Sequence, residues 1–315
     1  MAGTEIYSPK PHRRTWALLT IPLVWLFIYA GVWLSGRVAA VFGLNVSAAS
    51  GRWQDNLAAL FASGPVLLLL WLWLRYFEGR PLSSVGLGPW QGRRFGAGFL
   101  SGFIMVVVAV VEIGLVAQYE IVGPGAWYDH LTPTWLLASA LAIIGTLLQA
   151  TVTEAMFRGW MLQTVAGQWG AVLAVAFNMV ACLVIQGGPG VLRSPEALLG
   201  VINIMLISWY MCLRAMREQS LWGICGFHAA WNLTLGWGFG LNVDGGRLNI
   251  TPALLKIEAP VEHDWIWTGG DFGPNASIIM TSMAVLLLAT CFRGRKGGSG
   301  KPAPVRESYE TIIDH

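Results

Sequence analysis

Residues 95–118 read FGAGFLSGFIMVVVAVVEIGLVAQ, a run of 24 residues with a single ionisable side chain, Glu112. A helix that crosses a membrane needs about 20 predominantly apolar residues. This stretch is therefore predicted to be a transmembrane helix, and the whole chain shares its composition. Of 315 residues, 55% are hydrophobic and 12% are charged, whereas about 25% are charged in a typical soluble domain. The composition indicates a membrane protein.

Similar apolar runs predict an all-α, polytopic bundle of about eight transmembrane helices. The predicted spans are 15–36, 57–76, 95–118, 134–157, 170–187, 196–213, 220–241 and 276–292. They divide the chain into a short cytoplasmic segment (1–14), a transmembrane domain (15–292) and a polar, Gly/Pro/Lys-rich tail (293–315) predicted to be disordered.

Lysine and arginine predict the orientation, because these residues are enriched in cytoplasmic loops. With both termini cytoplasmic, 15 of the 20 basic residues fall on the inner side and 5 on the outer side. The segment from 242 to 275 is then exterior, acidic and aromatic. The net charge of +3 is too small to indicate a nucleic-acid partner, and membrane lipid is the expected contact. The four cysteines lie in apolar runs and predict no disulfide.

Few ionisable residues fall within the spans, and such residues carry the functional hypothesis in a membrane protein. Glu154 and Arg158 are four residues apart, and so are His228 and Asn232. Each pair therefore shares one helix face. If Arg158 marks the cytoplasmic end of its span, the two pairs reach a similar depth, where they could activate water and stabilise an oxyanion. The plainer interpretations are an interfacial salt bridge and interhelical hydrogen bonds. Glu112 is expected about 25 Å away by helical rise, as a structural acid.

Three short segments resemble one known family. Residues 153–159, TEAMFRG, look like its EExxFRG motif, residues 227–232, FHAAWN, like HxxxN, and residues 268–277, TGGDFGPNAS, like a TGGxFGPE segment. The family is that of the CPBP intramembrane proteases, also called Abi, which includes CAAX-processing and bacteriocin-processing enzymes. The resemblance covers roughly residues 95–278. It implies an eight-helix fold, a catalytic cavity open towards the cytoplasm, and peptide hydrolysis by water that a glutamate and a histidine activate.

The chain departs from the family pattern at three positions. Thr153 stands where the family has its water-activating glutamate, Asn275 stands where the FGPE-like segment has its acid, and Ala181 follows Phe177 where the FxxxH histidine is expected. A hydroxyl does not act as a general base at neutral pH without help. The proteolytic site is therefore predicted to be degenerate or rebuilt.

Several rebuilt sites remain open. Glu154 could take over as base, and hydrogen bonds could come from a polar stripe on the fifth span made of Asn178, Cys182 and Gln186. Cys225, one turn before His228, permits a Cys–His–Asn arrangement, although most buried thiols are packing residues. Glu154 and His228 offer two ligands where a metal site usually has three, so metal dependence is left open.

The leading hypothesis is a CPBP-like protein of the bacterial inner membrane with a degenerate or rebuilt glutamate/histidine endopeptidase site facing the cytoplasmic side. Its catalytic set is Glu154 as base, His228 and Asn232 polarising the scissile carbonyl, and Arg158 holding Glu154. The alternative is an inactive pseudoprotease that serves as a binding or assembly subunit of a membrane complex. The expected partners are membrane lipid, a membrane-associated peptide or protein, and complex subunits. A transporter is less favoured, because inverted repeats and broken helices are not evident.

Overall fold

The computed structural model describes residues 13–47, 50–117, 119–187, 194–260 and 264–293. The predicted tail, apart from Arg293, and most of the predicted N-terminal segment lie outside these ranges, as does the side chain of Gln186. The helices are α1 (Thr20–Val41), α2 (Trp53–Phe61), α3 (Ser63–Leu72), α4 (Gly92–Ala117), α5 (Pro133–Glu154), α6 (Leu162–Trp169), α7 (Ala171–Gly187), α8 (Pro195–Glu218), α9 (Trp222–Asn232), α10 (Trp265–Thr268) and α11 (Ile278–Arg293).

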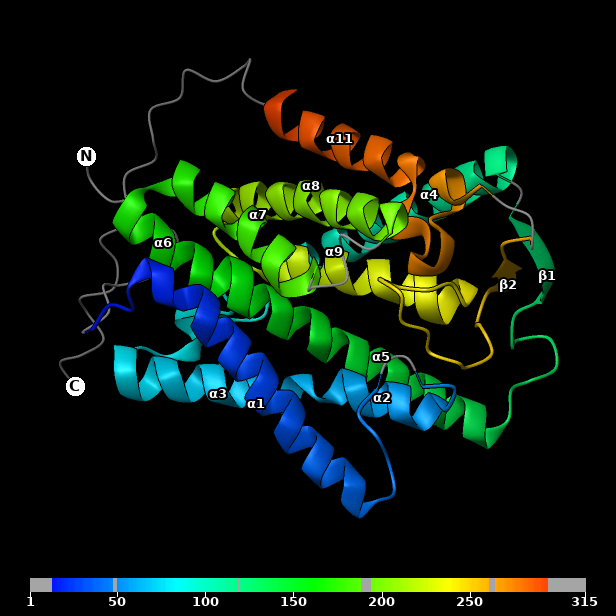
Figure 1. The fold of residues 1–315 in the computed structure, drawn as a ribbon, viewed down its shortest axis with the longest axis horizontal. Coiled ribbons are helices and arrows are strands. Elements are labelled where there is room, and N and C mark those ends of the chain that lie inside the picture. Colours follow the sequence, from blue (N-terminus) through cyan, green and yellow to red (C-terminus); the bar gives the residue numbers. More distant parts are fainter. Residues whose placement is uncertain (1–12, 48–49, 118, 188–193, 261–263, 294–315) are drawn as a thin grey trace.

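Three segments between these helices wind as π-helices: Trp73–Glu78, Ala155–Met161 and Leu233–Gly238. Short 3₁₀ turns cover Ala17–Leu19, Leu82–Val85, Gly270–Phe272 and Pro274–Ala276. One small sheet pairs β1 (Glu120–Pro124) antiparallel with β2 (Leu255–Glu258) at one end of the bundle (Figure 1). The all-α class holds, with this two-stranded sheet as an addition that the apolar runs did not predict.

Each predicted span corresponds to helix, but not all of the helices are long. Among the described residues, five helical stretches are long and apolar enough to cross a membrane: Ala17–Val41, Trp53–Glu78, Gly92–Val116, Pro133–Trp169 and Pro195–Glu218. Two shorter apolar helices, Ala171–Ile185 and Ile278–Phe292, accompany them. The seventh predicted span is α9 with its π-helical extension, and nearly all of it is buried inside the bundle.

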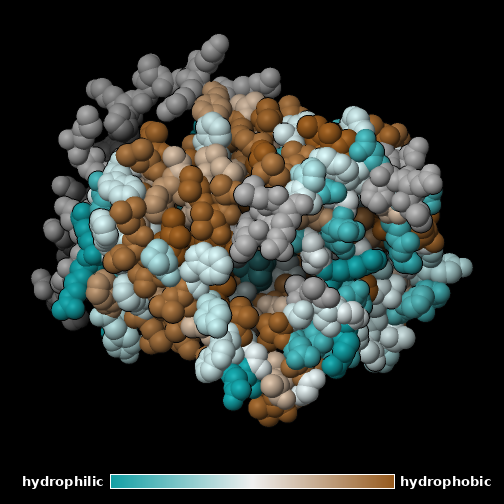
Figure 2. All heavy atoms as spheres, in the orientation of Figure 1, coloured by the Kyte–Doolittle hydropathy of each residue, from teal (hydrophilic) through white to brown (hydrophobic). Residues whose placement is uncertain are grey.

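The outward faces of the long helices are apolar. Leu26 of α1 is 56% exposed, and Leu100 of α4 and Leu137 of α5 are each 58% exposed. Figure 2 shows hydrophobic side chains over much of one face of the molecule, with hydrophilic ones gathered towards the end that carries the sheet. Soluble monomers rarely expose apolar surface on this scale. The chain is a multi-pass helical membrane protein.

Helix starts follow local capping rules. The Thr132 hydroxyl accepts a hydrogen bond from the Trp135 amide, with Pro133 in the first turn of α5. Ser194 caps α8 in the same way ahead of Pro195. Proline is tolerated in the first turn because its missing N–H has no intrahelical partner there.

Glycines set the contact between α4 and α9. A Cβ on Gly98 would lie 1.8 Å from the carbonyl oxygen of Gly223, and one on Gly102 would lie 2.5 Å from that of Phe227. In the opposite direction, a Cβ on Gly226 would lie 2.2 Å from the oxygen of Phe95. The two backbones therefore touch, as in small-residue packing of membrane helices. This contact fixes α9, and with it His228 and Asn232.

The prediction that Arg158 marks a cytoplasmic helix end was wrong. Helix α5 continues through the π-helix into α6 as one stretch, Pro133–Trp169, of 37 residues. Arg158 is 3% exposed and lies inside the bundle. The apolar residues that follow it, such as Trp160 and Met161, are fully buried, so the helix gains by continuing into the core.

Candidate functional site

The two polar pairs lie on two helices that each change their winding at the site. Glu154 is the last residue of α5, and Arg158 lies in the π-helix that follows. Asn232 is the last residue of α9, and a second π-helix starts at Leu233. A π-turn inserts an extra residue and turns side chains to a new direction, and such turns are frequent at functional sites.

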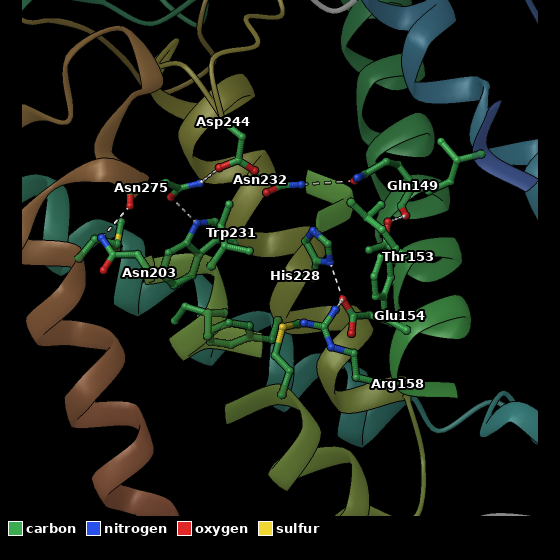
Figure 3. Close-up of a pocket in the computed structure, with 18 of the residues that line it drawn as sticks. Gln149, Thr153, Glu154, Arg158, Asn203, His228, Trp231, Asn232, Asp244 and Asn275 are labelled. Carbon is green, nitrogen blue, oxygen red and sulfur yellow. Dashed lines mark hydrogen bonds and ion pairs between the residues drawn. The ribbon is translucent and has the colours of Figure 1, made fainter. Parts of the chain in front are cut away.

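Glu154 joins the two helices. Its Oε1 lies 2.7 Å from Nδ1 of His228 and 3.2 Å from Nη1 of Arg158 (Figure 3). The Glu154 side chain is 0% exposed, Arg158 4% and His228 19%. A buried carboxylate is costly unless it is paired and hydrogen-bonded, and here a guanidinium and an imidazole both pair with it.

This contact fixes the orientation of the imidazole. Because Glu154 Oε1 already accepts a hydrogen bond from Arg158, it acts as an acceptor towards His228 as well, so Nδ1 of His228 carries the proton. In the neutral ring, Nε2 then has a free lone pair. Figure 3 shows the second ring nitrogen on the side of Asn232, away from Glu154.

Two buried polar atoms at this centre have no partner among the described residues: Oε2 of Glu154 and Nε of Arg158. Unpaired buried polar atoms are rare and often mark functional sites. Of the predicted polar stripe of α7, Asn178 contacts the backbone of this centre, and Cys182 lies against the hydroxyl of Ser208 at 3.4 Å. Asn178 donates to the carbonyl oxygen of Phe157, a residue of the π-helix that follows α5, at 2.7 Å.

Amide groups line the next part of the site. The Nδ2 group of Asn232 donates to Oε1 of Gln149 at 3.3 Å. Thr153 donates its hydroxyl to the backbone oxygen of Gln149 at 2.9 Å, so the hydroxyl is used within its own helix. Asn232 forms no hydrogen bond with Glu154 or Arg158, but it faces the same pocket.

A second polar chain comes from the 242–275 segment. The indole of Trp231 donates to Oδ1 of Asn275 at 2.9 Å, and the Asn275 amide donates to Oδ1 of Asp244 at 2.8 Å. Asn203 of α8 holds the Asn275 backbone oxygen at 2.8 Å. Protein atoms around the Asp244 carboxyl raise its pKa by desolvation, while the Asn275 amide and His228 act in the opposite direction.

These groups surround one pocket of about 420 Å³, and Figure 2 shows a recess near the middle of the drawn face. Its apolar walls come from α1, α7, α8, α9, the π-helix after α5, the 3₁₀ turn Gly270–Phe272 and the start of α11. The lining residues are Trp25, Ile28, Gln149, Thr153, Glu154, Phe157, Arg158, Ile185, Asn203, Ile204, Ile207, Met211, Phe227, His228, Trp231, Asn232, Asp244, Phe272, Asn275 and Met280.

The structure thus brings Glu154, Arg158, His228 and Asn232 to one pocket. Glu112 is not among the lining residues and has no hydrogen bond or ion pair with any other described residue. The pocket also includes Gln149 and Asp244, which sequence reasoning missed. Gln149 lies four residues before Thr153 and shares its helix face, which is a usable signal.

Two of the alternative sites are not supported by this geometry. Cys225 is fully buried and does not line the pocket, as expected of a packing thiol. Ala181 is also fully buried, and no side chain there replaces the histidine of the resemblance. Within the described ranges, no three His, Cys, Asp or Glu side chains lie together as metal ligands would.

Residues 133–234 match a family model described as type II CAAX prenyl endopeptidase Rce1-like. This segment is Rce1-like. The match confirms the resemblance to CAAX-processing membrane proteases that the short motifs indicated. No curated protein and no solved structure matches the chain.

The Rce1-like segment begins at the first residue of α5 and ends in the π-helix after α9. It therefore contains Glu154, Arg158, His228 and Asn232 together with the connecting helices. Asp244 and Asn275 lie outside it. The part of the pocket that they form comes from this chain's own 242–275 segment.

Proposed function

We propose that this chain acts on a membrane-associated peptide, using an Rce1-like endopeptidase site rebuilt around the Glu154–His228 pair. The observation that carries the proposal is the 2.7 Å contact from Glu154 to His228 at the wall of an amide-lined pocket. The Rce1-like match supports peptide hydrolysis as the reaction class, because the matched description is that of an endopeptidase.

His228 is the group best placed to act as base, and Glu154 positions it. A water in the pocket gives a proton to Nε2 of His228 while its oxygen attacks the carbonyl carbon of the peptide. His228 then passes the proton to the leaving nitrogen as the C–N bond breaks, giving an acid and an amine. The sequence predicted Glu154 as the base and His228 as a group that polarises the carbonyl. We assign the base to His228 instead, because Glu154 is fully buried and already accepts two hydrogen bonds.

Asn232 supplies the stabilisation of the oxyanion. Its amide carries two N–H groups, of which one is directed to Gln149 at 3.3 Å. The other can donate to the oxygen on which negative charge develops. Removal of one such donor typically slows an enzyme by about 10²–10³-fold. Arg158 acts through Glu154, and we regard it as a positioning residue.

The test compares protein termini in membranes of three strains: a deletion, the deletion with wild type, and the deletion with His228→Ala. A matched control is His130→Ala, because His130 is exposed and does not line the pocket. Equal membrane levels of all variants are required. We expect a set of new termini with wild type and with His130→Ala that is absent with His228→Ala. Termini that persist with His228→Ala would contradict the peptidase.

A pseudoprotease is the second candidate, favoured by a specific observation. Thr153 gives its hydroxyl to its own helix, and Ala181 has no polar group, so neither water-activating position of the resemblance can serve. The protein would then bind a peptide or a membrane-complex subunit without cleaving it, and the half-buried aromatic residues Trp265 and Trp267 of the 242–275 segment could contribute to the contact. Rescue of a deletion phenotype by His228→Ala, with no terminus changed, would support this candidate.

We place the protein in the bacterial inner membrane because the short motifs resemble bacterial members of the family, and we place both termini in the cytoplasm on the bias of basic residues. With Arg158 removed from the inner side, 14 basic residues remain against 5. The pocket includes Asp244, Phe272 and Asn275 of the segment predicted to be exterior. It therefore reaches towards the outer side, rather than only the cytoplasmic side that the resemblance implied.

A further inference from the structure

The pocket contains two carboxylates, Glu154 and Asp244, and they differ in their partners. Glu154 is paired with Arg158 and His228. Asp244 has no ion pair with any described residue, and its carboxylate accepts a hydrogen bond from the neutral amide of Asn275. Figure 3 shows Asp244 and Asn275 at the end of the pocket away from Glu154 and Arg158.

The position of Asp244 is fixed by its own backbone turn and by its hydrogen-bond partner Asn275. Its backbone has a φ of 51°, in a tight turn closed by the pairing of Val243 with Gly246. The amide of Gly245 donates to the oxygen of Phe272 at 3.0 Å, which ties this turn to the next loop. Asn275, in turn, is fixed by Trp231 and Asn203. A left-handed aspartate costs conformational energy, and such strain is concentrated at functional sites.

This arrangement leaves the pocket with an unbalanced negative charge. Among its lining residues, Glu154 and Asp244 are acidic and Arg158 is basic. Arg158 already pairs with Glu154 at 3.2 Å, so no cationic side chain among the described residues forms an ion pair with Asp244. The Asp244 residue is solvent-exposed on one side and lines the pocket on the other, so its carboxylate is accessible to an incoming cation and can form a charge-assisted hydrogen bond with it.

We propose that the pocket selects peptide segments that carry a cationic group, a lysine or arginine side chain or an N-terminal ammonium, and that Asp244 binds this group. The peptide carbonyl then lies next to His228, towards the other end of the pocket. This rests on the peptide binding in the proposed function, but not on hydrolysis. The competing explanation is that Asp244 only stabilises its own turn through Asn275.

The experiment uses the full-length protein in phosphatidylcholine nanodiscs, which carry no net lipid charge. Three apolar peptides with one central photo-crosslinking residue are compared, identical except for a neighbouring Lys, Gln or Glu. Crosslinking is measured against peptide concentration, and the crosslinked residues are mapped. For wild type we expect the Lys peptide to bind about tenfold more tightly than the Gln peptide, and the Glu peptide most weakly.

Charge variants identify the group responsible. Asp244→Asn keeps the size of the side chain and should remove the preference for Lys. Asp244→Lys should reverse it in favour of the Glu peptide. The matched control is Asp271→Asn, because Asp271 is an exposed acid of the same segment outside the pocket. An unchanged preference in Asp244→Asn, or an equal loss in Asp271→Asn, would overturn the inference.

A blocked pocket separates this inference from the proposed function. Ile204→Trp fills the pocket from α8 without changing its charge. If the three peptides crosslink to wild type equally, and Ile204→Trp abolishes crosslinking, peptide binding stands and the cationic preference is wrong. If no peptide crosslinks to wild type above the level of Ile204→Trp, both the inference and the proposed function fail.

Discussion

At the scale of single residues, the site depends on one oxygen atom. Oε1 of Glu154 accepts from His228 and from Arg158, so loss of this carboxylate has two consequences. His228 loses the acceptor that orients it, and Arg158 is left as a buried cation without its counter-charge. The unpaired Arg158 cation affects folding, whereas the loss of His228 orientation affects the reaction. Separate measurements of stability and of processing can therefore distinguish the two.

Glu154→Gln should destabilise the protein by about 3 kcal/mol, the usual cost of breaking a buried pair from one side. It should also remove the termini that depend on His228. The double variant Glu154→Gln/Arg158→Gln should lose less stability than the sum of the two single variants, because neither buried charge remains unpaired. Thermal unfolding in detergent measures this coupling. Glu112→Gln is the control, and additive losses in the double variant would show that the pair is not coupled.

Asp244 gives a prediction for pH dependence. Desolvation raises the pKa of its carboxyl in the folded protein, so folding favours the protonated form. The associated stability is present below the usual aspartate pKa and is lost as the pH rises through the raised value. The charged or polar groups facing it are His228 and Asn275, with Glu154 and Arg158 further along the pocket.

The Tm of Asp244→Asn minus that of wild type should therefore increase between pH 4 and pH 7. The change should be small, because the Asp244 residue is largely exposed. Asp271→Asn serves as the reference for a surface carboxylate. A difference that stays constant with pH would show that the Asp244 carboxyl is fully hydrated.

At the scale of elements, the position of His228 depends on how closely α9 approaches α4. The approach needs glycine, because a Cβ on Gly98 would lie 1.8 Å from the carbonyl oxygen of Gly223, and backbone cannot yield as a flexible side chain does. Gly98→Ala should separate the helices, lower the Tm by several degrees and reduce processing that depends on His228.

Gly96→Ala is the matched control on the same helix, since a Cβ there would meet nothing within 4 Å. It should be neutral or stabilising by roughly 0.5–1 kcal/mol, because alanine loses less backbone entropy than glycine in a helix. Equal effects of the two substitutions would mean that α4 and α9 do not touch as described.

Element-level features also show what the sequence could and could not predict. Apolar runs located the helices, and i, i+4 spacing with the short motifs located Glu154, Arg158, His228 and Asn232. The end of the helical stretch that begins with α5 was misplaced, because Arg158 was taken as its boundary. In the structure Glu154 neutralises Arg158 inside the bundle, and the helix continues. Asp244 was missed because a left-handed turn and the side chain of Asn275 bring it to the pocket, and neither leaves a periodic signal.

At the scale of the whole molecule, the orientation of the chain in the membrane decides from which side the pocket is accessible. The sheet lies at one end of the bundle (Figure 1), and its strand β2 belongs to the same 242–275 segment as Asp244. The positive-inside bias predicts that the 242–275 segment is exterior. In this orientation, a cationic peptide segment would reach Asp244 from the exterior.

Cysteine labelling tests this orientation with little background, because all four native cysteines are buried. Asp271→Cys introduces a thiol at an exposed position of the 242–275 segment, and Ser83→Cys introduces one at an exposed position between α3 and α4. A membrane-impermeant maleimide should label Asp271→Cys in intact cells and Ser83→Cys only after permeabilisation. The reverse pattern would place the acidic end of the pocket in the cytoplasm, and a peptide would then have to reach Asp244 from that side.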